Sequence, residues 1–268
     1  MQRNPPVFAA EQVSCVVPSL EGDRTVFSGL AFSIARGEIV DLMGPSGSGK
    51  SSLLTAFARL NPHASGSFAL DGVDAASFTP QQWRREVAYL PQKPILPGDT
   101  VAQAIRLPFM LSVRAGTART ADGGGRTPGP LARLARLFRD DASRARDMLP
   151  DARIRQTLDA MGCGDIDLER RPHDLSGGQA ARVSLARTLL TEPRMLLADE
   201  VDAGLDDGNA DKVASIMTYA AGRGMAIVRI RHRPPDGQAS RIVTLADGTL
   251  HEDCVGAATG SAVDGKAA

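Results

Sequence analysis

Short runs of apolar residues, separated by Gly, Pro and Asp, dominate the pattern of hydrophobic and polar positions along the chain. Runs of this length are typical of β-strands, and a run that is apolar throughout indicates a strand buried on both faces of a parallel sheet. We interpret as strands the runs at 13–17, 25–34, 39–43, 67–70, 87–90, 195–198, 225–230 and 242–245. The first two runs predict an antiparallel pair, because a turn sequence at 21–24 separates them.

Apolar residues at helical spacing follow several of these runs. The segments that predict helices begin at Lys50 and Ser176 and cover 154–161 and 212–219. Strands that alternate with helices are typical of an α/β fold with a parallel sheet. Residues 91–110 differ, because they contain four prolines, and we expect an extended or disordered loop there rather than a long helix.

A segment rich in Gly, Pro, Arg and Thr begins at Arg114 and predicts a flexible insertion, which we extend to residue 147. Within it, apolar residues recur at helical spacing over 131–138, with Arg between them. Two interpretations remain open for this piece: a basic amphipathic helix that contacts lipid or a partner, or a short helix that packs on its own domain. The small, polar residues at 256–268 are expected to fray.

The stretch IVDLMGPSGSGKSS at 39–52 carries the strongest chemical signal. A buried strand runs into the pattern G-x-x-x-x-G-K-[ST] and then into a helix, so that backbone amides and the helix N-terminus face a phosphate group. We expect Lys50 to reach the β- and γ-phosphates and Ser51 to ligate Mg²⁺. The predicted nucleotide-binding residues are Gly44, Pro45, Ser46, Gly47, Ser48, Gly49, Lys50, Ser51 and Ser52.

A second buried run, at 195–198, ends in Asp199 and Glu200. Ligands of open α/β sheets bind at the carboxyl ends of the strands, so Asp199 is expected to hold Mg²⁺. Glu200 is expected to accept a proton from the attacking water, or to orient it. The alternative is an ordinary acidic pair at the end of a strand.

The sequence LSGGQ at 175–179 predicts a helix N-terminus with Ser176 as its N-cap. Gly177 and Gly178 keep side chains clear of this end of the helix, which predicts a second anion-binding site on the same chain. Taken alone, the sequence fits an ordinary capped helix equally well.

Composition narrows the function without assigning it. Hydrophobic residues make up 43% and charged residues 23% of the chain, as in globular proteins with a substantial core. The net charge of +0 gives no reason to expect a nucleic-acid partner. The three cysteines are far apart and form no C-x-x-C pair, so we expect reduced thiols. There is no signal-peptide pattern and no run of 18 apolar residues, so a membrane role would come through a partner.

These motifs together resemble the ATP-binding subunit of ABC transporters, over about residues 10–255. The resemblance implies a P-loop NTPase (RecA-like) core with an antiparallel β subdomain and an inserted α-helical subdomain. It also implies one cassette over 1–255, with the core at 1–91 and 180–255 and the helical subdomain at about 92–179. The matching motifs are GPSGSGKSS at 44–52, PQKP at 91–94, LSGGQ at 175–179, MLLADE at 195–200, AGLD at 203–206 and His232.

The same resemblance implies two cofactors, ATP and Mg²⁺, and a head-to-tail dimer of two cassettes. Residues Ser176, Gly177, Gly178 and Gln179 of one copy would close over the phosphates held by the other copy. By the same resemblance Gln92 links nucleotide and metal to a transmembrane permease on a separate chain, His232 contacts the γ-phosphate and Asp206 couples the two sites. The implied catalytic residues are Glu200, His232 and Gln92, and the implied metal ligands are Ser51, Gln92 and Asp199.

The implied function is ATP hydrolysis that powers transport, at the cytoplasmic side of the cell (inner) membrane. Two other classes remain open. A soluble ABC ATPase of DNA repair or translation usually carries a coiled-coil insertion, zinc-ligand cysteines or a second cassette, and no such feature is visible here. A regulatory cassette with little turnover is the other alternative, against which Lys50, Asp199, Glu200 and His232 argue.

Several positions depart from the family pattern. The aromatic residue that stacks on adenine, expected near 17–20, is absent, and Phe27 and Phe32 fit a strand core better. Val201 stands where the family has proline, and Arg231 stands where it has threonine. The segments 94–101 and 241–245 are similar to the FetAB-type iron exporter ATPases, which makes iron export a candidate role.

Overall fold

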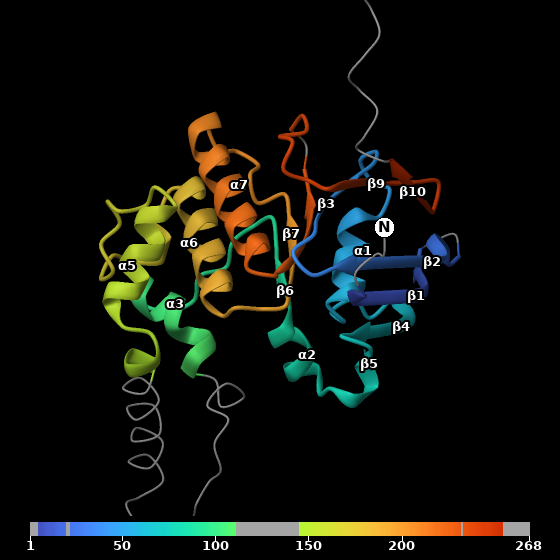
Figure 1. The fold of residues 1–268 in the computed structure, drawn as a ribbon, viewed down its shortest axis with the longest axis horizontal. Coiled ribbons are helices and arrows are strands. Elements are labelled where there is room, and N and C mark those ends of the chain that lie inside the picture. The colour runs from blue at the N-terminus through green and yellow to red at the C-terminus, as the bar shows by residue number, and fades with distance from the viewer. Residues whose placement is uncertain (1–4, 20–21, 111–144, 232, 254–268) are drawn as a thin grey trace, which may run out of the picture.

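The computed structural model describes residues 5–19, 22–110, 145–231 and 233–253. Its strands form two sheets, and its helices lie between the sheets and on the outer side of the larger one (Figure 1). The smaller sheet consists of β1 (Pro6–Val17), β2 (Arg24–Ala35), β4 (Ala64–Leu70) and β5 (Val73–Asp74). The larger sheet consists of β3 (Ile39–Met43), β6 (Val87–Leu90), β7 (Met195–Asp199), β8 (Ala226–Ile230), β9 (Arg241–Ala246) and β10 (Thr249–Asp253). The helices are α1 (Lys50–Phe57), α2 (Pro80–Glu86), α3 (Val101–Met110), α5 (Asp151–Ala160), α6 (Gly177–Leu190) and α7 (Asp207–Gly222), with 3₁₀ turns at Ala75–Ser77 and Pro172–Asp174.

The smaller sheet is antiparallel, in the order β2-β1-β4-β5. The predicted pairing of the first two runs is confirmed, with Phe8 opposite Ile34 and Ala10 opposite Phe32. Both strands are longer than the runs predicted, and β1 already begins at Pro6. Phe27 and Phe32 are buried as the strand pattern predicted, because their side chains face the helix α1 between the two sheets.

The larger sheet has the order β10-β9-β3-β8-β7-β6, in which only the edge strand β10 runs antiparallel to its neighbour. Strands β7 and β8 are buried along their whole length, because helices or the smaller sheet cover both faces. This explains why their sequences are apolar without alternation. The carboxyl ends of five parallel strands therefore lie along one edge, and the loops that follow β3, β6, β7 and β8 meet there.

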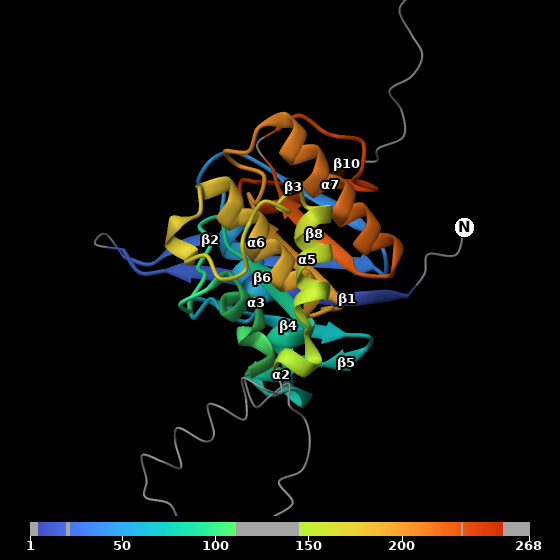
Figure 2. The same cartoon turned by 90° about the vertical axis from the view of Figure 1, so that its left-hand side faces the viewer.

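Two hydrophobic cores lie on the two faces of the larger sheet. In the first, α1 packs between the sheets, and Phe57 at its end contacts Phe8 and Phe32. The indole of Trp83, which is fully buried, donates a hydrogen bond of 2.9 Å to the carbonyl of Phe57. The second core is formed by α3, α5, α6 and α7, which cover the opposite face (Figure 2). Both faces of the larger sheet are thus covered by hydrophobic cores.

The prediction of a loop over residues 91–110 is wrong for its second half, which is helix α3. Three of the four prolines precede the helix, and Pro108 lies in its last turn, where it removes one backbone hydrogen bond. The first turn is capped, because the amide of Gln103 donates to the hydroxyl of Thr100 over 3.2 Å. The amide of Asp99 in turn donates to the side-chain oxygen of Gln103 over 3.0 Å. The pattern Thr-x-x-Gln was the sequence signal for this helix.

Several predictions fall on residues outside the described ranges. They concern His232, the amphipathic pattern at 131–138, nearly all of the insertion at 114–147 and the tail at 256–268. Cys15 and Cys163 are buried and carry free thiols, and burial raises the pKa of the Cys163 thiol. Across the described part of the chain, every helix is too short or too polar to cross a bilayer.

Candidate functional site

The glycine-rich loop lies between the carboxyl end of β3 and the start of α1, as the sequence predicted. Gly44 has φ 143°, and a Cβ atom there would lie 2.2 Å from the carbonyl oxygen of Leu245. Gly49 has φ 100°, and a Cβ atom there would lie 2.5 Å from a methyl carbon of Val26. Side chains are therefore excluded at both ends of the loop, and the backbone can approach a ligand closely.

The ammonium group of Lys50 lies inside this loop. Its side chain is 7% exposed, and Nζ donates to the carbonyl of Gly44 over 2.8 Å and to that of Pro45 over 2.9 Å. Helix α1 has no side-chain cap at Gly49, so its first amides point into the loop without a side-chain acceptor. The buried hydroxyl of Ser48 has no hydrogen-bond partner among the described residues. A cation, uncapped amides and an unpaired hydroxyl together fit the oxygens of a phosphate group.

A hollow of about 600 Å³ opens beside the loop. It is lined by the start of β2 at 24–28, by loop residues 45–48 and by the β9–β10 turn at 247–249. The only aromatic residue in this lining is Phe27, whose ring is 1% exposed and cannot stack on a base. The sequence lacks the aromatic residue expected near 17–20 to stack on adenine. Among the described residues that line the hollow, no other ring is exposed to take its place.

Two carboxylates stand at the end of β7, two strands away from the loop. Asp199 is 4% exposed, and the hydroxyl of Tyr89 donates to its Oδ2 over 2.9 Å. Burial, and then the charge of Asp199, raise the pKa of the Tyr89 hydroxyl, which stays protonated as a donor. Sequence reasoning missed Tyr89, because it lies on the neighbouring strand β6 and 110 residues away in the chain. Carboxylate and hydroxyl oxygens such as those of Asp199 and Ser51 are the donors that Mg²⁺ prefers.

Glu200 and Gln92 are in direct contact. The side-chain amide of Gln92 donates to Oε2 of Glu200 over 2.6 Å, so the loop after β6 touches the end of β7. Glu200 has φ 52°, a left-handed conformation that few residues other than glycine adopt. The structure therefore brings together the two residues that the sequence placed 108 positions apart.

The signature segment forms the N-terminus of α6, as predicted. Ser176 is the N-cap: the amide of Gln179 donates to its hydroxyl over 3.2 Å, and the amide of Ser176 donates to Gln179 Oε1 over 3.1 Å. Gly177 faces open space. Among the described residues, no hydrogen bond or ion pair joins this segment to the glycine-rich loop of the same chain, so each forms its own anion-facing end.

Asp206 is the N-cap of α7 and is linked to the signature helix α6 by hydrogen bonds through one residue, Asn209. The amide of Asn209 donates to Asp206 Oδ1 over 2.9 Å, and this hydrogen bond lowers the pKa of the Asp206 carboxyl. Arg182 of α6 donates to the side-chain oxygen of Asn209 over 2.6 Å. Arg182 is 8% exposed and was not singled out in the sequence, although it couples the two helix N-termini.

A family model described as ABC transporter matches residues 27–203, which include the glycine-rich loop, the signature segment and Asp199–Glu200. The chain belongs to the ABC transporter family. The probable iron export ATP-binding protein FetA of Escherichia coli strain K12 is 29% identical over 247 residues, 91% of this chain and 93% of FetA. The macrolide export ATP-binding/permease protein MacB 1/2 of Paracoccus denitrificans is 34% identical over 251 residues, 92% of this chain.

The chain spans 33% of that MacB protein, so it matches only part of an ATP-binding/permease protein. Among solved structures, a dimeric post-hydrolysis state of the ATP-binding cassette MJ0796, bound to ADP and Pi, is similar with a TM-score of 0.67. That likeness has 22% sequence identity and covers 92% of this chain and 98% of the cassette. Membership of the family confirms the predicted recognition, the P-loop NTPase fold class and the class of activity, ATP hydrolysis coupled to transport.

Proposed function

We propose that this chain is the ATP-hydrolysing subunit of an exporter whose membrane-spanning part is a separate permease chain. The observation that carries the proposal is the pairing of a buried lysine inside a phosphate-sized loop with two carboxylates at the same sheet edge. Ligands of open α/β sheets bind at this edge. The match over almost the full length of FetA favours a separate permease, whereas the MacB match favours one chain that carries both parts.

The loop residues 44–52 bind the phosphates in this proposal, with Lys50 directed at the β- and γ-phosphates. Ser51 and Asp199, with Gln92, hold Mg²⁺, which neutralises charge on the phosphate oxygens when it is bound. Glu200 orients the attacking water and accepts its proton, and His232 contacts the γ-phosphate. In the structure Gln92 donates a hydrogen bond to Oε2 of Glu200, which places the proposed metal ligand beside the proposed base.

The dimer that we propose is head to tail, with the signature residues 176–179 of one copy over the phosphates held by the other. Support comes from the two anion-facing helix ends of a single chain, which no described contact joins. A two-fold arrangement pairs each loop with a signature segment, which makes two equal sites. Asp206 lies beside the signature helix and is placed to couple those two sites.

A groove of about 490 Å³ between α2, β6, α3 and α6 supports a docking place for the permease. Its lining combines apolar side chains such as Leu107 with the cationic Arg84 and Arg85, so it suits a short amphipathic segment with acidic residues. Tyr89 also lines the groove, and its hydroxyl contacts Asp199. A permease segment bound in this groove would contact Tyr89, which is hydrogen-bonded to Asp199, the proposed metal ligand. In this proposal the permease docks at the cytoplasmic face of the cell membrane.

The division into subdomains remains our proposal: one cassette over 1–255, with its core at 1–91 and 180–255 and a helical subdomain at 92–179. Helices α3 and α5 support it, because both pack with α6 in the second core. We propose that the insertion at 114–147 contacts the permease or lipid headgroups. Deleting 114–144 is expected to reduce membrane recruitment, and unchanged recruitment and ATPase coupling would reject this role.

The cargo that we propose to test first is iron, because FetA is named for probable iron export. Macrolide export is the second candidate and is favoured by the 34% identity to MacB 1/2. The iron and macrolide resistance of cells that carry the parent chain, compared with that of cells that lack the chain or carry Lys50→Ala, would distinguish the two. If resistance to iron and to macrolides is the same with and without a functional chain, both cargoes are rejected. The proposal that the chain hydrolyses ATP would still stand.

The decisive experiment compares Glu200→Gln with the parent protein and with Glu192→Gln, a matched change of an exposed glutamate at the end of α6. We expect Glu200→Gln to bind Mg-ATP, to lose turnover and to form a stable dimer, measured by light scattering after size exclusion. Glu192→Gln is expected to behave as the parent. A Glu200→Gln protein that turns over ATP like the parent, or remains monomeric alone and with its permease, would contradict the proposal.

A further inference from the structure

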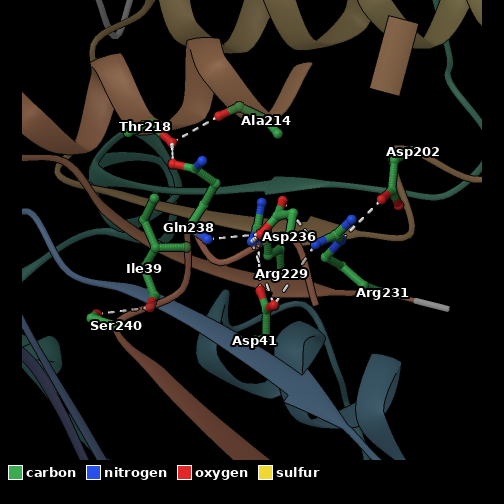
Figure 3. A network of polar contacts seen from close by, with 10 residues as sticks. All are labelled: Ile39, Asp41, Asp202, Ala214, Thr218, Arg229, Arg231, Asp236, Gln238 and Ser240. Carbon is green, nitrogen blue, oxygen red and sulfur yellow. Dashed lines mark hydrogen bonds and ion pairs between the residues drawn. The ribbon is translucent and has the colours of Figure 1, made fainter. Parts of the chain in front are cut away.

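Five charged side chains form a buried ion network directly behind the sheet edge that carries Glu200 (Figure 3). Asp41 lies on β3, Arg229 on β8, Arg231 and Asp236 in the loop after β8, and Asp202 in the loop after β7. No side chain of the five is more than 17% exposed. Charges are rarely buried so completely without a partner, and here each has at least one.

The two arginines share the three aspartates between them. Arg229 donates to Asp41 over 2.6 Å and to Asp236 over 2.7 Å. Arg231 donates from Nε to Asp202 over 3.0 Å, and its Nη1 lies 2.8 Å from the second oxygen of Asp236. The guanidinium of Arg231 thus connects the loop after β8 to the loop after β7. A planar group with several donors suits both contacts.

The loop after β7 begins with the strained backbone of Glu200, at φ 52°. Such a conformation persists only where surrounding contacts hold it. The amide of Glu200 donates to the carbonyl of Ile230 over 3.2 Å, and the amide of Ala203 closes a turn on the carbonyl of Glu200 over 3.0 Å. The pair Arg231–Asp202 lies next to this backbone bond on both loops, since Arg231 follows Ile230 and Asp202 lies in the turn.

We propose that Arg231 is a positioning residue for Glu200, which it holds through Asp202 and the 200–203 turn. The contact fixes the loop after β7 against the end of β8 and so fixes the direction of the Glu200 carboxylate. Arg231 also directly precedes His232 in the sequence. Its side chain therefore connects the segment that carries Glu200, the proposed base, with the segment that carries His232, the proposed γ-phosphate contact. This inference rests on the proposed function, because it assigns Arg231 to the same ATP hydrolysis.

The test separates positioning from stability with three variants: Arg231→Met, Asp202→Leu and the double variant. Arg231→Met is expected to lower kcat at least about tenfold, because a displacement of about 1 Å can cost about 100-fold in rate. Its Kd for ATP should stay within about twofold of the parent, because Lys50 and the loop are unchanged. Arg231→Lys keeps one charged donor near Asp202 and should recover part of the kcat.

The double variant removes one positive and one negative charge, so the rest of the network keeps the net charge of the parent network. Replacing a buried ion pair by apolar residues of similar size is often neutral for stability. The Tm should therefore return toward that of the parent, whereas kcat should stay low because the side-chain contact between the 200–203 turn and the loop after β8 is lost. Recovery of kcat together with Tm would show that the pair is structural only, and would overturn the inference.

Hydrogen exchange of the backbone amides at 200–205 provides a readout without ATP. Exchange at Glu200 and Ala203 is expected to speed up in the double variant, and unchanged exchange would overturn the inference. Arg153→Met is the matched control, because it breaks the exposed ion pair with Glu192 at 2.6 Å and should leave kcat and exchange unchanged. If the parent protein itself does not hydrolyse Mg-ATP, the proposed function is refuted. The exchange measurement would still test whether the Arg231–Asp202 contact holds the 200–203 turn.

Discussion

The two glycine-rich helix ends of this chain are built differently. Helix α1 begins at Lys50 without any side-chain cap, and the loop before it holds a buried ammonium group. Helix α6 begins at Gly177 with a complete capping box formed by Ser176 and Gln179. The first end leaves its amides for a ligand and has the charge to attract it. At the end of α6, the amide of Gln179 already donates to the hydroxyl of Ser176, and the first turn contains no cationic residue.

This difference indicates unequal tasks at the two ends. In the function that we propose, the end of α1 holds the triphosphate by itself, because its amides, its lysine and the hydroxyl of Ser48 all lack a competing anion. The end of α6 offers the amides of Gly177 and Gly178 on a rigid, pre-capped helix, which suits contact with a phosphate that is already bound elsewhere. We propose that the first end binds the nucleotide and that the second end recognises the bound state.

The largest expected effect comes from Lys50→Ala. ATP affinity should fall roughly 10- to 150-fold, because a hydrogen bond to a charged group contributes about 1.5–3 kcal/mol. Calorimetry with Mg-ATP measures it, and Lys212→Ala on α7 serves as the control for loss of a lysine. An unchanged affinity would show that the end of α1 does not bind the triphosphate.

Ser176→Ala tests the other end. Loss of the cap should cost about 1 kcal/mol, which lowers the Tm of a domain of this size by about 2–4 °C. ATP binding by the single chain should not change, whereas the Mg-ATP-dependent dimer of the Glu200→Gln protein should weaken. Thr79→Ala is a matched control, since Thr79 and Gln82 form the same capping box at α2. Equal dimer formation by both cap variants would contradict the recognition role of α6.

Tyr89→Phe should have a smaller effect, on the metal rather than on the nucleotide. The change removes the hydroxyl that holds Asp199, worth about 1 kcal/mol, so the Mg²⁺ concentration for half-maximal turnover should rise about fivefold. Tyr219→Phe, at the only other tyrosine, is the control because its side chain is 68% exposed. Because burial raises the pKa of Tyr89, spectrophotometric titration of the parent should show the Tyr89 hydroxyl ionising only above the pH range of an ordinary tyrosine, and this late step should be absent from the Tyr89→Phe protein.

The smallest effect concerns a third helix end, that of α7. Hydrogen bonds from Asn209 hold the pKa of Asp206 below its usual range, so its stabilisation is present above that range and is lost as the pH falls through the folded-state pKa. Asp206→Asn keeps the cap but removes the charge. The difference in Tm between parent and variant should therefore be largest near neutral pH and shrink as the pH falls through the ordinary range of an aspartate and below it. A difference that grows on acidification would contradict this assignment.

The parts of the fold that could be predicted from sequence are those that depend on residues close together in the chain. Strand β3 was predicted with its observed bounds, because an apolar run ends at a glycine that the loop requires. The cap of α6 was predicted because its partners are three residues apart. Helix α3 was missed, because two local rules disagreed there: proline content argued against a helix, and the Thr100–Gln103 cap argued for one.

The parts that could not be predicted depend on partners far apart in the chain. Tyr89 meets Asp199 across 110 residues, and Arg229 meets Asp41 across 188 residues. A sequence pattern cannot supply such pairs, but it does contain a hint. A charged residue stands inside each of two otherwise apolar buried strands, β3 and β8, and two opposite charges buried on neighbouring strands must find each other.

The chain contains a single tryptophan, and its indole is hydrogen-bonded to the last residue of α1. The indole is thus hydrogen-bonded to the C-terminal end of α1, and the N-terminal end of the same helix faces the proposed phosphate site. Its emission should shift when that helix tilts or slides, and the signal comes from one position only. Tryptophan emission is therefore an expected intrinsic readout of nucleotide binding, to be followed in a stopped-flow instrument without labels.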